Sequence, residues 1–587
     1  MLEHRIQLQQ LRRTHLMPEK DAEQRALARS ILSPERNGTL SAEQMLKAWQ
    51  KIKRNVRSLH ERIFFRPLLA AVSTLSRDEV VLSEQAAQDR LAALGYRDPR
   101  GAMRHIKALT TGLSRSADIQ RHLMPVLLGW FARGVDADAG LLGFRIVSES
   151  LGSTSWYLRM LRDSPAAAER LSQLLSSSRP MTDLLEDASA SIAWLDKVAD
   201  LKPLGEEALA SEISSLLARH ADAAEAMRAV RYLRRRETLR TAMGWTLGIV
   251  DVEDTCAGLA AIDECTIGAA LRIALRELQI TAEESEAGET AGEQLLTRIA
   301  IIGMGRLGGA ENGFGSDADV MFVHEPLEGV DEDAAQEQAA RIVNRTLALL
   351  KQPVKPAIRA ERPLEVDADL RPEGKQGAIV RSLDSYRSYY ERWAETWEFQ
   401  ALTRARPIAG DEALGEAFVE LIDPYRYPAT FTPEQVQQIR RMKARVENER
   451  MPHGADRTRQ LKLGRGGLSD VEWLVQLVQL RHAHAVPGLR TTSTLKALNA
   501  AVEAGLVEAA DAEVLSGAWL LATKIRGGNV LRGVRQSDTL PSGRADLEAI
   551  ARWCGYPAGS ARALEEDYLR QTRNARKVYE RLFFEEH

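Results

Sequence analysis

The fold of this chain follows from residues Arg298–Glu325, RIAIIGMGRLGGAENGFGSDADVMFVHE. They begin with the apolar run Ile299–Ile302, which predicts a buried strand. The glycine-rich turn Gly303–Gly309 follows it. After the polar segment Ser316–Asp319, a second apolar run, Val320–Val323, predicts another strand. Two kinds of site fit this strand–turn–strand pattern, and they differ in how the two strands are connected.

The first candidate is a dinucleotide-binding turn. Gly303, Gly305 and Gly308 satisfy the pattern G-x-G-x-x-G after a strand, and Glu325 stands about twenty residues on, where a ribose-binding acid belongs. However, a crossover between parallel strands needs a dozen or more residues, usually a helix. The segment Leu307–Ser316 is shorter, and its glycines disfavour a helix. The connection therefore argues against dinucleotide binding.

The second candidate is a metal-dependent nucleotidyltransferase site. Asp317 and Asp319 are two residues apart, so in a strand they point to the same face. Paired carboxylates repel each other unless a cation neutralises them, and Mg²⁺ prefers carboxylate oxygens. The preceding glycines allow backbone N–H groups to approach a phosphate, while Arg306 and Ser316 add a charge and a hydroxyl. We favour this interpretation over a solvated aspartate pair at a strand edge.

A third carboxylate is expected from residues 364–370, LEVDADL, where apolar and acidic residues alternate. Glu365, Asp367 and Asp369 share one face of the predicted strand. The turn Arg371–Gly377 follows with two cations, which would suit a triphosphate. Spacing alone does not choose among the three acids, and a solvated strand face would show the same alternation.

Four segments carry a resemblance to a known family. They are 303–322 (GMGRLGGAENGFGSDADVMF), 365–377 (EVDADLRPEGKQG), 395–411 (ETWEFQALTRARPIAGD) and 462–473 (KLGRGGLSDVEW). In their residues, order and spacing they resemble the bifunctional glutamine synthetase adenylyltransferase/adenylyl-removing enzymes. The resemblance implies a chain that is mostly α-helical, with one α+β nucleotidyltransferase domain similar to that of DNA polymerase β and helical bundles on both sides.

The same resemblance implies roles for individual residues. Asp317 and Asp319 match the metal-binding pair, and Asp367 matches the third catalytic carboxylate. Asp369 stands where many members carry a basic residue, so it receives no role. Arg306 stands where lysine is common, which keeps the charge but replaces a point charge by a planar fork. The expected nucleotide-binding residues are Gly303, Gly305, Arg306, Gly308, Ser316, Arg371 and Lys462.

The implied reaction is Mg²⁺-dependent transfer of AMP from ATP to a tyrosine hydroxyl of glutamine synthetase. It releases pyrophosphate and down-regulates nitrogen assimilation. A PII signal protein and glutamine are the implied regulators. The alternatives are a nucleotidyltransferase that acts on another acceptor and a catalytically inactive regulatory scaffold. The intact Asp317-x-Asp319 pair disfavours the scaffold.

The two ends of the chain resemble each other. Arg54–Phe65 (RNVRSLHERIFF) matches Arg573–Phe584 (RNARKVYERLFF). Because the family carries two related modules, we expect the chain to begin inside the last helices of a preceding adenylyl-removing module. The predicted division is 1–75 for that helical end, 76–290 for a helical connector, 291–430 for the catalytic domain and 431–587 for a C-terminal helical bundle.

Composition excludes several classes of protein. A chain of 587 residues is too long for one core. A net charge of −3 gives no reason to expect bulk nucleic-acid or membrane binding. The three cysteines, Cys256, Cys265 and Cys554, are scattered, which predicts a reducing compartment such as the cytoplasm.

Four local expectations complete the sequence interpretation. The acidic, glycine-containing segment Ile280–Gly292 is the predicted linker before the sheet, and the basic segment Arg231–Arg240 is a predicted exposed helix face. Ser469 and Glu472 have the spacing of a capping box. Arg404 and Arg406 end a helical segment that the resemblance places beside the active site, where they could contact phosphate.

Overall fold

The computed structural model describes residues 2–10, 17–18, 20–31, 41–60, 77–111, 115–152, 154–278, 280–281, 293–359, 361–534 and 537–585. The chain forms two compact units, Met1–Gly129 and Trp130–His587. The expectation of a mostly helical chain with one small mixed sheet is confirmed. Among the described helices, none combines the length and the apolar character that crossing a membrane requires.

The first unit is helical. Its helices are α1 (Leu2–Gln10), α2 (Asp21–Arg29), α3 (Ala42–His60), α5 (Arg77–Leu94), α6 (Pro99–Thr110) and α7 (Arg115–Ala132), the last of which runs across the boundary. Ile6, Leu27 and Met45 bring α1, α2 and α3 into one small apolar cluster. The first copy of the repeated pattern falls partly in α3, and its residues 61–65 lie outside the described residues.

The second unit opens with a helical segment that leads to the sheet. It contains α8 (Ala137–Leu151), α9 (Ser155–Asp163), α10 (Pro165–Leu175), α11 (Arg179–Asp187), the 3₁₀ helices η2 (Ser189–Asp196) and η3 (Val198–Leu201), α12 (Glu206–Arg219), α13 (Ala223–Thr246) and α14 (Val252–Glu277). The short strands β1 (Ile280–Thr281) and β2 (Glu293–Gln294) pair in parallel. Residues 282–292 of the predicted linker lie outside the described residues.

The central sheet and its helices follow. Along the chain they are β3 (Thr297–Gly303), α15 (Gly305–Gly308), β4 (Ala318–Pro326), α16 (Glu332–Lys351), β5 (Val366–Asp367), η4 (Gly374–Gln376), β6 (Val380–Ser382), α17 (Leu383–Arg392), α18 (Thr396–Leu402), β7 (Arg406–Gly410) and α19 (Glu412–Arg426). The strand order is β5-β4-β3-β7, and β6 also pairs with β4.

The connection between β3 and β4 settles the choice between the two sequence interpretations. These strands are antiparallel neighbours, with Ile301 opposite Phe322, and a single helical turn, α15, lies in the segment that joins them. A dinucleotide-binding unit requires parallel strands and a long crossover helix. The structure therefore excludes that interpretation.

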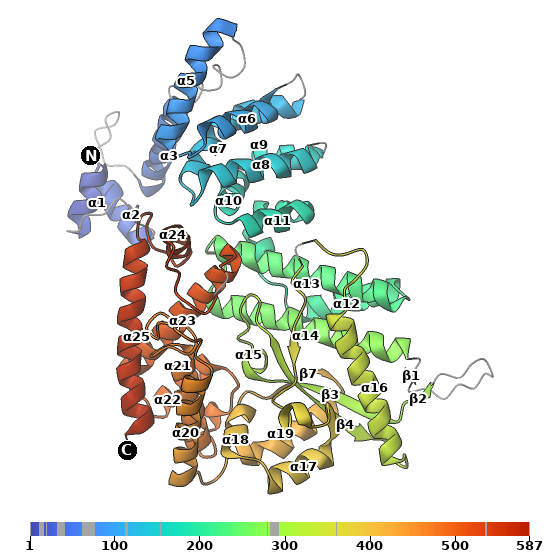
Figure 1. The fold of residues 1–587 in the computed structure, drawn as a ribbon. Coiled ribbons are helices and arrows are strands. Elements are labelled where there is room, and N and C mark those ends of the chain that lie inside the picture. Colours follow the sequence, from blue (N-terminus) through green and yellow to red (C-terminus); the bar gives the residue numbers. More distant parts are fainter. Residues whose placement is uncertain are drawn as a thin grey trace. The chain divides into compact units, whose positions relative to one another are not determined.

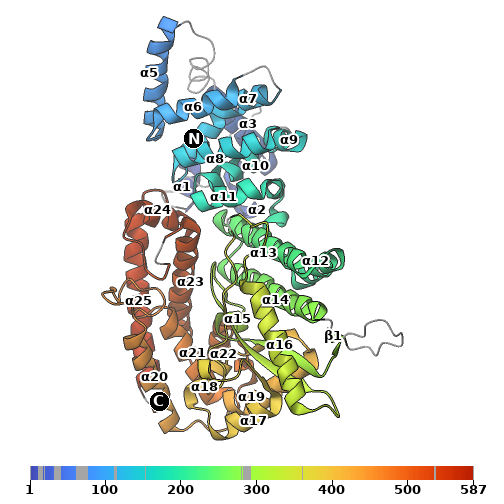
Figure 2. The ribbon, with the colours of Figure 1, turned by 45° about the vertical axis from the view of Figure 1, so that its right-hand side comes forward.

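Alternation along β3 and β4 covers both faces of the sheet. Ile299, Ile301, Val320 and Phe322 pack with α14 and α16 on one face, and Ala300, Ile302, Met321 and Val323 pack with α17 and α19 on the other. Figures 1 and 2 show α14 lying across the sheet next to α16. The core of the sheet thus includes α14, which the predicted division assigns to the connector 76–290.

The basic segment of α13 is not an exposed face, so that prediction was wrong. Arg231, Arg235 and Glu237 are each less than a tenth exposed. Arg231 forms an ion pair of 2.5 Å with Glu361, far along the chain. The charges are neutralised by residues that local sequence does not reveal, which allows the helix to lie inside the fold.

The C-terminal bundle contains α20 (Pro433–Glu449), α21 (Leu468–His482), η5 (Pro487–Leu489), α22 (Thr494–Glu503), α23 (Ala509–Arg532), α24 (Arg544–Trp553) and α25 (Ala561–Phe584). Its core is a large apolar cluster that includes Trp519, Tyr568 and Phe583. Buried Asp470 joins α21 to its neighbours through Lys443 at 2.8 Å and Arg576 at 3.0 Å.

The predicted capping box on α21 was wrong. The helix begins at Leu468 with Gly467 as its N-cap, so Ser469 lies inside the first turn. The Ser469 hydroxyl accepts a hydrogen bond from Lys443 Nζ at 2.9 Å. Glu472 points instead to Arg306 in the segment between β3 and β4.

Candidate active site

Three aspartates meet where β4 and β5 begin to pair. Asp317 lies directly before β4, Asp319 is the second residue of β4, and Asp367 is the last residue of β5. The strands are parallel, and their register places Asp319 opposite Asp367. The apolar partners Leu364, Val366 and Ala368 are buried behind them, as the alternation predicts. Strand pairing thus brings together acids that lie almost fifty residues apart.

The environment of Asp319 shows the electrostatic cost of this arrangement. Burial, and after it the carboxylate of Asp367, raises the pKa of Asp319 to about 6, with a further contribution from Asp317. Lys462 and Arg450 oppose that rise. Like charges held together in a partly desolvated place favour a proton or a metal cation. The group therefore has the character of a cation site.

The three carboxylates fit a magnesium ion better than a metal that needs a complete protein cage. Within the described part of the chain, no set of three or more His, Cys, Asp and Glu side chains already converges on a metal position. Mg²⁺ is commonly held by one or two carboxylates together with waters and substrate phosphates. Such an ion requires only that carboxylates lie near each other at a site open to substrate.

The glycine turn packs against this carboxylate group. The Met304 N–H donates to the Asp319 carbonyl at 2.8 Å. Gly305 has φ +52°, and a Cβ there would overlap the Asp319 carboxylate. Gly303 and Gly308 face protein instead: a Cβ on either would collide, with Ile408 for Gly303 and with the Arg404 carbonyl for Gly308. Close packing alone accounts for glycine at 303 and 308, and their contact with nucleotide stays a prediction.

Arg306 is held by the C-terminal bundle. Its Nη2 lies 3.3 Å from a carboxylate oxygen of Glu472, and its guanidinium lies 5.9 Å from the centre of the Trp519 ring. Its Nη1 is buried and has no hydrogen-bond partner among the described residues. Burial alone would raise the pKa of Glu472, but Arg306, Arg404 and Lys462 lower it overall. Arg306 therefore retains one donor for a ligand.

The other three predicted nucleotide-binding side chains, Ser316, Arg371 and Lys462, differ in whether they already hydrogen-bond to the protein. Ser316 accepts a hydrogen bond from the Gly313 N–H at 2.9 Å, which closes the loop before Asp317. Arg371 donates to the carbonyls of Ala368 at 2.8 Å and Gly377 at 3.1 Å, so it braces its own turn. Lys462 is exposed on the loop before α21 and acts electrostatically on Asp319.

Comparison with known proteins identifies the family. Residues 168–421 match the model of glutamate-ammonia ligase adenylyltransferase. The chain is 49% identical over 590 residues to the bifunctional glutamine synthetase adenylyltransferase/adenylyl-removing enzyme of Leifsonia xyli subsp. xyli, covering 100% of this chain and 56% of that protein. The chain belongs to this adenylyltransferase family.

Two more relatives of the adenylyltransferase family carry the same name. The protein of Streptomyces avermitilis is 48% identical over 99% of this chain and 58% of its own length. That of Corynebacterium efficiens is 41% identical over 100% of this chain and 55% of its own length. The chain thus spans a little over half of the relatives it matches. Residues 1–64 and 440–583 match a second model, GlnD PII-uridylyltransferase, and these ranges contain most of the two similar end segments.

In this member of the adenylyltransferase family, the two arginines expected near phosphate are used inside the fold. Arg404 is 5% exposed and forms an ion pair of 2.5 Å with Glu311. Arg406 pairs with Glu264 of α14 at 2.5 Å. Both positions are occupied by structural ion pairs, so the expectation of a phosphate contact was wrong for Arg404, which is buried.

Glu311 is a residue that the sequence interpretation missed. It accepts hydrogen bonds from the Thr494 N–H at 2.6 Å and the Thr494 hydroxyl at 2.9 Å, besides its pair with Arg404. These contacts fasten the loop before Asp317 to the start of α22. A glutamate inside a glycine-rich segment was the available signal, but its partners come from distant parts of the chain.

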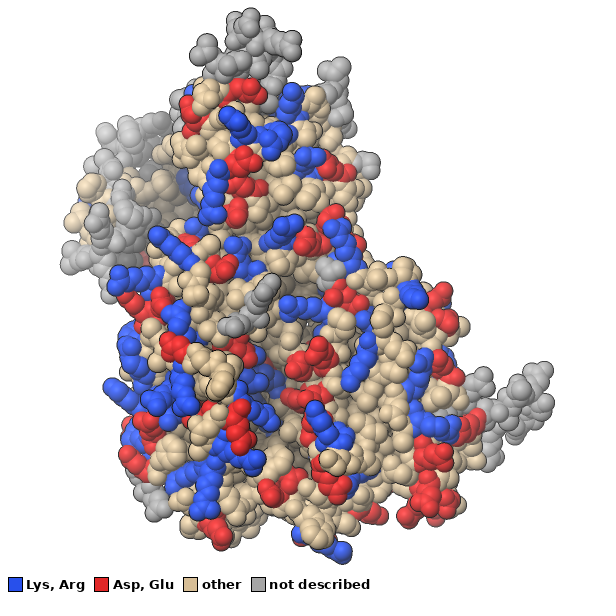
Figure 3. All heavy atoms as spheres, viewed as in Figure 1, with Lys and Arg blue, Asp and Glu red and all other residues tan. Residues whose placement is uncertain are grey.

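Two cavities adjoin Asp317. One, of 720 Å³, is lined by the acids Asp317, Glu365, Asp367 and Asp369 and by the cations Lys351, Arg371 and Lys375. The other, of 520 Å³, extends from Asp317 towards α11 and α13. Acidic and basic side chains are interspersed over the face of the second unit shown in Figure 3, so charge selectivity must come from such local groups.

Proposed function

We propose that this chain transfers AMP from ATP to a tyrosine hydroxyl of glutamine synthetase and releases pyrophosphate. The observation that carries the proposal is the register that sets Asp319 opposite Asp367. Asp317 lies two residues before Asp319, and the glycine turn packs against the Asp319 carboxylate. The relatives' names state the activity and the protein substrate. We further propose that the sheet and its helices form a nucleotidyltransferase domain of the DNA polymerase β type.

Different residues of the chain would bind the metal, bind the phosphates and position the glycine turn. Asp317, Asp319 and Asp367 would hold Mg²⁺, which when bound lowers the pKa of a coordinated hydroxyl and stabilises charge on phosphate oxygens. Lys462 and the free Nη1 of Arg306 would bind the phosphates that leave as pyrophosphate. Gly305 would keep the turn close to Asp319, so that phosphate and carboxylates share one place.

In-line displacement at the α-phosphorus sets a geometric requirement on these groups. The attacking and leaving oxygens must lie on opposite sides of that atom. Cations that bind the leaving phosphates therefore belong on one side of the carboxylates, with the acceptor hydroxyl on the other. Orientation and charge stabilisation supply most of the catalysis in such reactions.

Partners and location follow from the same proposal. Glutamine synthetase is the protein substrate, and a PII signal protein and glutamine are the regulators that we expect. We expect no role for nucleic acid or a membrane. We place the protein in the cytoplasm, because Cys256, Cys265 and Cys554 are all free thiols.

Transfer from α-labelled ATP to purified glutamine synthetase tests the proposal. Wild type with Mg²⁺ should label the synthetase, and Asp317→Asn should reduce labelling at least about 100-fold. Asp317 is exposed, so the change should not unfold the protein. Asp333→Asn, an equally exposed aspartate in the first turn of α16, is the matched control and should label normally.

Each other outcome is informative. If wild type binds Mg²⁺–ATP but labels only a different protein, the carboxylate site stands and the acceptor is wrong. If Asp317→Asn labels as well as wild type, the carboxylates do not hold the catalytic metal and the proposed mechanism fails.

A further inference from the structure

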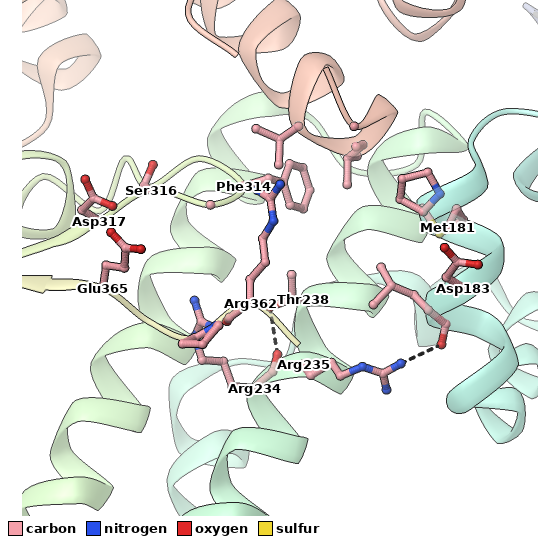
Figure 4. A pocket seen from close by; sticks show the side chains of 17 residues that line it. Met181, Asp183, Arg234, Arg235, Thr238, Phe314, Ser316, Asp317, Arg362 and Glu365 are labelled. Carbon is pink, nitrogen blue, oxygen red and sulfur yellow. Dashed lines mark hydrogen bonds between the residues drawn. The ribbon is translucent and has the colours of Figure 1, made fainter. Parts of the chain in front are cut away.

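A cavity of 520 Å³ lies beside the proposed carboxylate site and is not used by it. Figure 4 shows Ser316, Asp317 and Glu365 at one end of this cavity and Met181 and Asp183 at the other. Its lining includes neither the glycine turn nor Arg306 nor Lys462. The cavity therefore reaches Asp317 and the predicted nucleotide-binding residue Ser316, but it does not include Arg306 or Lys462, which are proposed to bind the leaving phosphates.

Three arginines line the cavity, but two of them are already paired. Arg234 lies 2.6 Å from Asp263, and Arg235 lies 3.3 Å from Asp187. Arg362 is exposed, and in the part of the chain that the structure describes it has no ion-pair partner. Arg235 is buried, although its Nε and Nη1 have no hydrogen-bond partner among the described residues. Arg362 is thus the exposed cation of this cavity that can meet an external carboxylate without giving up an ion pair.

Arg362 is directed along the loop that carries Asp317. In Figure 4 its side chain extends beside Phe314. Gly315 has φ +68°, and a Cβ there would lie 2.7 Å from Arg362 Nη1. Glycine at 315 therefore lets the guanidinium lie against the loop two residues before Asp317. A group bound to Arg362 would lie close to a group that approaches Asp317.

One wall of the cavity is apolar. Phe314 is 6% exposed and packs edge-on against Trp245, with ring centres 6.1 Å apart. Met181 and Val530 continue this wall. Aromatic side chains gain affinity by packing against such surfaces while their hydroxyl remains hydrogen-bonded. The cavity thus combines an apolar wall with one free cation beside the carboxylates.

We propose that this cavity receives the acceptor segment of the protein substrate, a segment in which an acidic residue flanks the reacting tyrosine. The tyrosine ring would pack on the Phe314 wall with its hydroxyl at Asp317, and the flanking carboxylate would pair with Arg362. This inference rests on the proposed function and deepens it. It assigns Arg362 as a specificity-determining residue for the acceptor, with no part in nucleotide binding.

The reaction at this position balances as follows. The tyrosine oxygen forms a bond to the α-phosphorus, and the bond from that phosphorus to the oxygen bridging to the β-phosphorus breaks. The phenolic proton leaves to water, and the electron pair of the broken bond departs with pyrophosphate. In-line displacement requires the nucleophile and the leaving pyrophosphate to lie on opposite sides of the α-phosphorus.

The test is steady-state AMP transfer to glutamine synthetase by Arg362→Glu and Arg362→Lys, with direct measurement of Mg²⁺–ATP binding. Arg362→Glu should raise the KM for the synthetase about 10-fold or more, because it places like charges together. Its affinity for Mg²⁺–ATP should stay within about twofold of wild type. Arg362→Lys should fall between wild type and Arg362→Glu, because it keeps the charge without the planar fork.

A matched control separates a local effect from a change of net charge. Arg573 is an exposed arginine of α25 without an ion-pair partner among the described residues. Arg573→Glu should leave both the KM for the synthetase and the affinity for ATP unchanged. Raising the salt to about 0.5 M should narrow the difference between wild type and Arg362→Glu, since the interaction is electrostatic.

Three outcomes would overturn this inference, and they are distinguishable. An unchanged KM for the synthetase in Arg362→Glu, with normal transfer, would overturn the acceptor site alone. A loss of ATP affinity with an unchanged acceptor KM would show that the cavity holds the nucleotide. Absence of transfer by wild type would overturn the proposed function, and this inference with it.

Discussion

Asp319 and Asp367 lie opposite each other on the parallel strands β4 and β5, next to the pair formed by Ala318 and Val366. The Asp367 carboxylate therefore raises the cost of ionising Asp319. The pKa of Asp319 is about 6, first because it is buried and second because Asp367 is near. This relationship makes the apo site sensitive both to protons and to divalent cations.

Stability should depend on pH through Asp319. Because its folded pKa is above the unfolded value, its favourable contribution is complete below about pH 4 and is lost as the pH rises through about 6. Asp319→Asn should therefore gain stability relative to wild type across that window, by on the order of 1–3 kcal/mol. Thermal melts of both proteins from pH 4 to 8, without divalent cations, measure the difference. Asp333→Asn should show a flat difference. A flat difference for Asp319→Asn as well would show that neither burial nor Asp367 raises the pKa of Asp319.

Mg²⁺ should offset the loss of stability that ionised Asp319 causes beside Asp367. At pH 7.5, addition of Mg²⁺ with ATP should raise the melting temperature of wild type, because ligands that bind only the folded state stabilise it. Asp367→Asn should lose most of this rise, since one carboxylate of the facing pair is then neutral. Equal shifts in wild type and Asp367→Asn would show that Asp367 does not help to hold the cation.

Gly305 should be required for function beyond its backbone conformation. Gly305→Ala adds a methyl group that overlaps the Asp319 carboxylate, in addition to a positive φ of 52°. We expect at least about 10-fold weaker Mg²⁺–ATP binding and roughly 1–3 kcal/mol lower stability. Gly329 has φ +77° with open space around it, so Gly329→Ala should lose about 1 kcal/mol and keep full ATP binding. Equal ATP binding by both variants would show that contact with Asp319 is unimportant.

Arg306 and Glu472 should behave as a coupled pair. Arg306→Met leaves Glu472 buried beside fewer cations and should cost roughly 3 kcal/mol of unfolding free energy. The double variant Arg306→Met with Glu472→Gln should recover part of that loss, because no buried charge is then left unpaired. Urea unfolding of the two single variants and the double variant gives the coupling. Additive losses would contradict a direct interaction.

Glu311 and Arg404 should stabilise the loop that leads to Asp317. Arg404→Met leaves the buried Glu311 carboxylate with Thr494 alone, so we expect a loss of roughly 3–5 kcal/mol. Arg392 is an exposed arginine on α17, and Arg392→Met should change stability by less than about 0.5 kcal/mol. Denaturant midpoints measure both. A small effect of Arg404→Met would mean that Thr494 and water satisfy Glu311.

Local sequence was sufficient where structure follows from local periodicity. The apolar runs 299–302 and 320–323 predicted the two central strands, and the short glycine-rich connection argued correctly against a parallel crossover. The alternation from Leu364 to Leu370 predicted which side chains turn inward. These features depend on residues within a few positions of each other, so composition and spacing carry them.

The ion pairs could not be predicted from the sequence, because the partners lie far apart along the chain. Arg231–Arg240 has the composition of an exposed helix face, yet Arg231 is buried against Glu361, 130 residues on. Arg404 has the sequence context of a phosphate ligand, yet it pairs with Glu311. Glu472 has the spacing of a helix cap, yet it contacts Arg306.

Local sequence is enough to predict the strands, the glycine turn and the Asp317-x-Asp319 pair, because each is a pattern of neighbouring residues. Spacing left Glu365, Asp367 and Asp369 equally placed, and only the pairing of β5 with β4 put Asp367 opposite Asp319. The tertiary structure also gives Arg234 and Arg235 ion-pair partners, whereas Arg362 has none among the described residues. Both outcomes depend on which distant carboxylates and strands come into contact, and charge neutralisation in the folded chain selects among them.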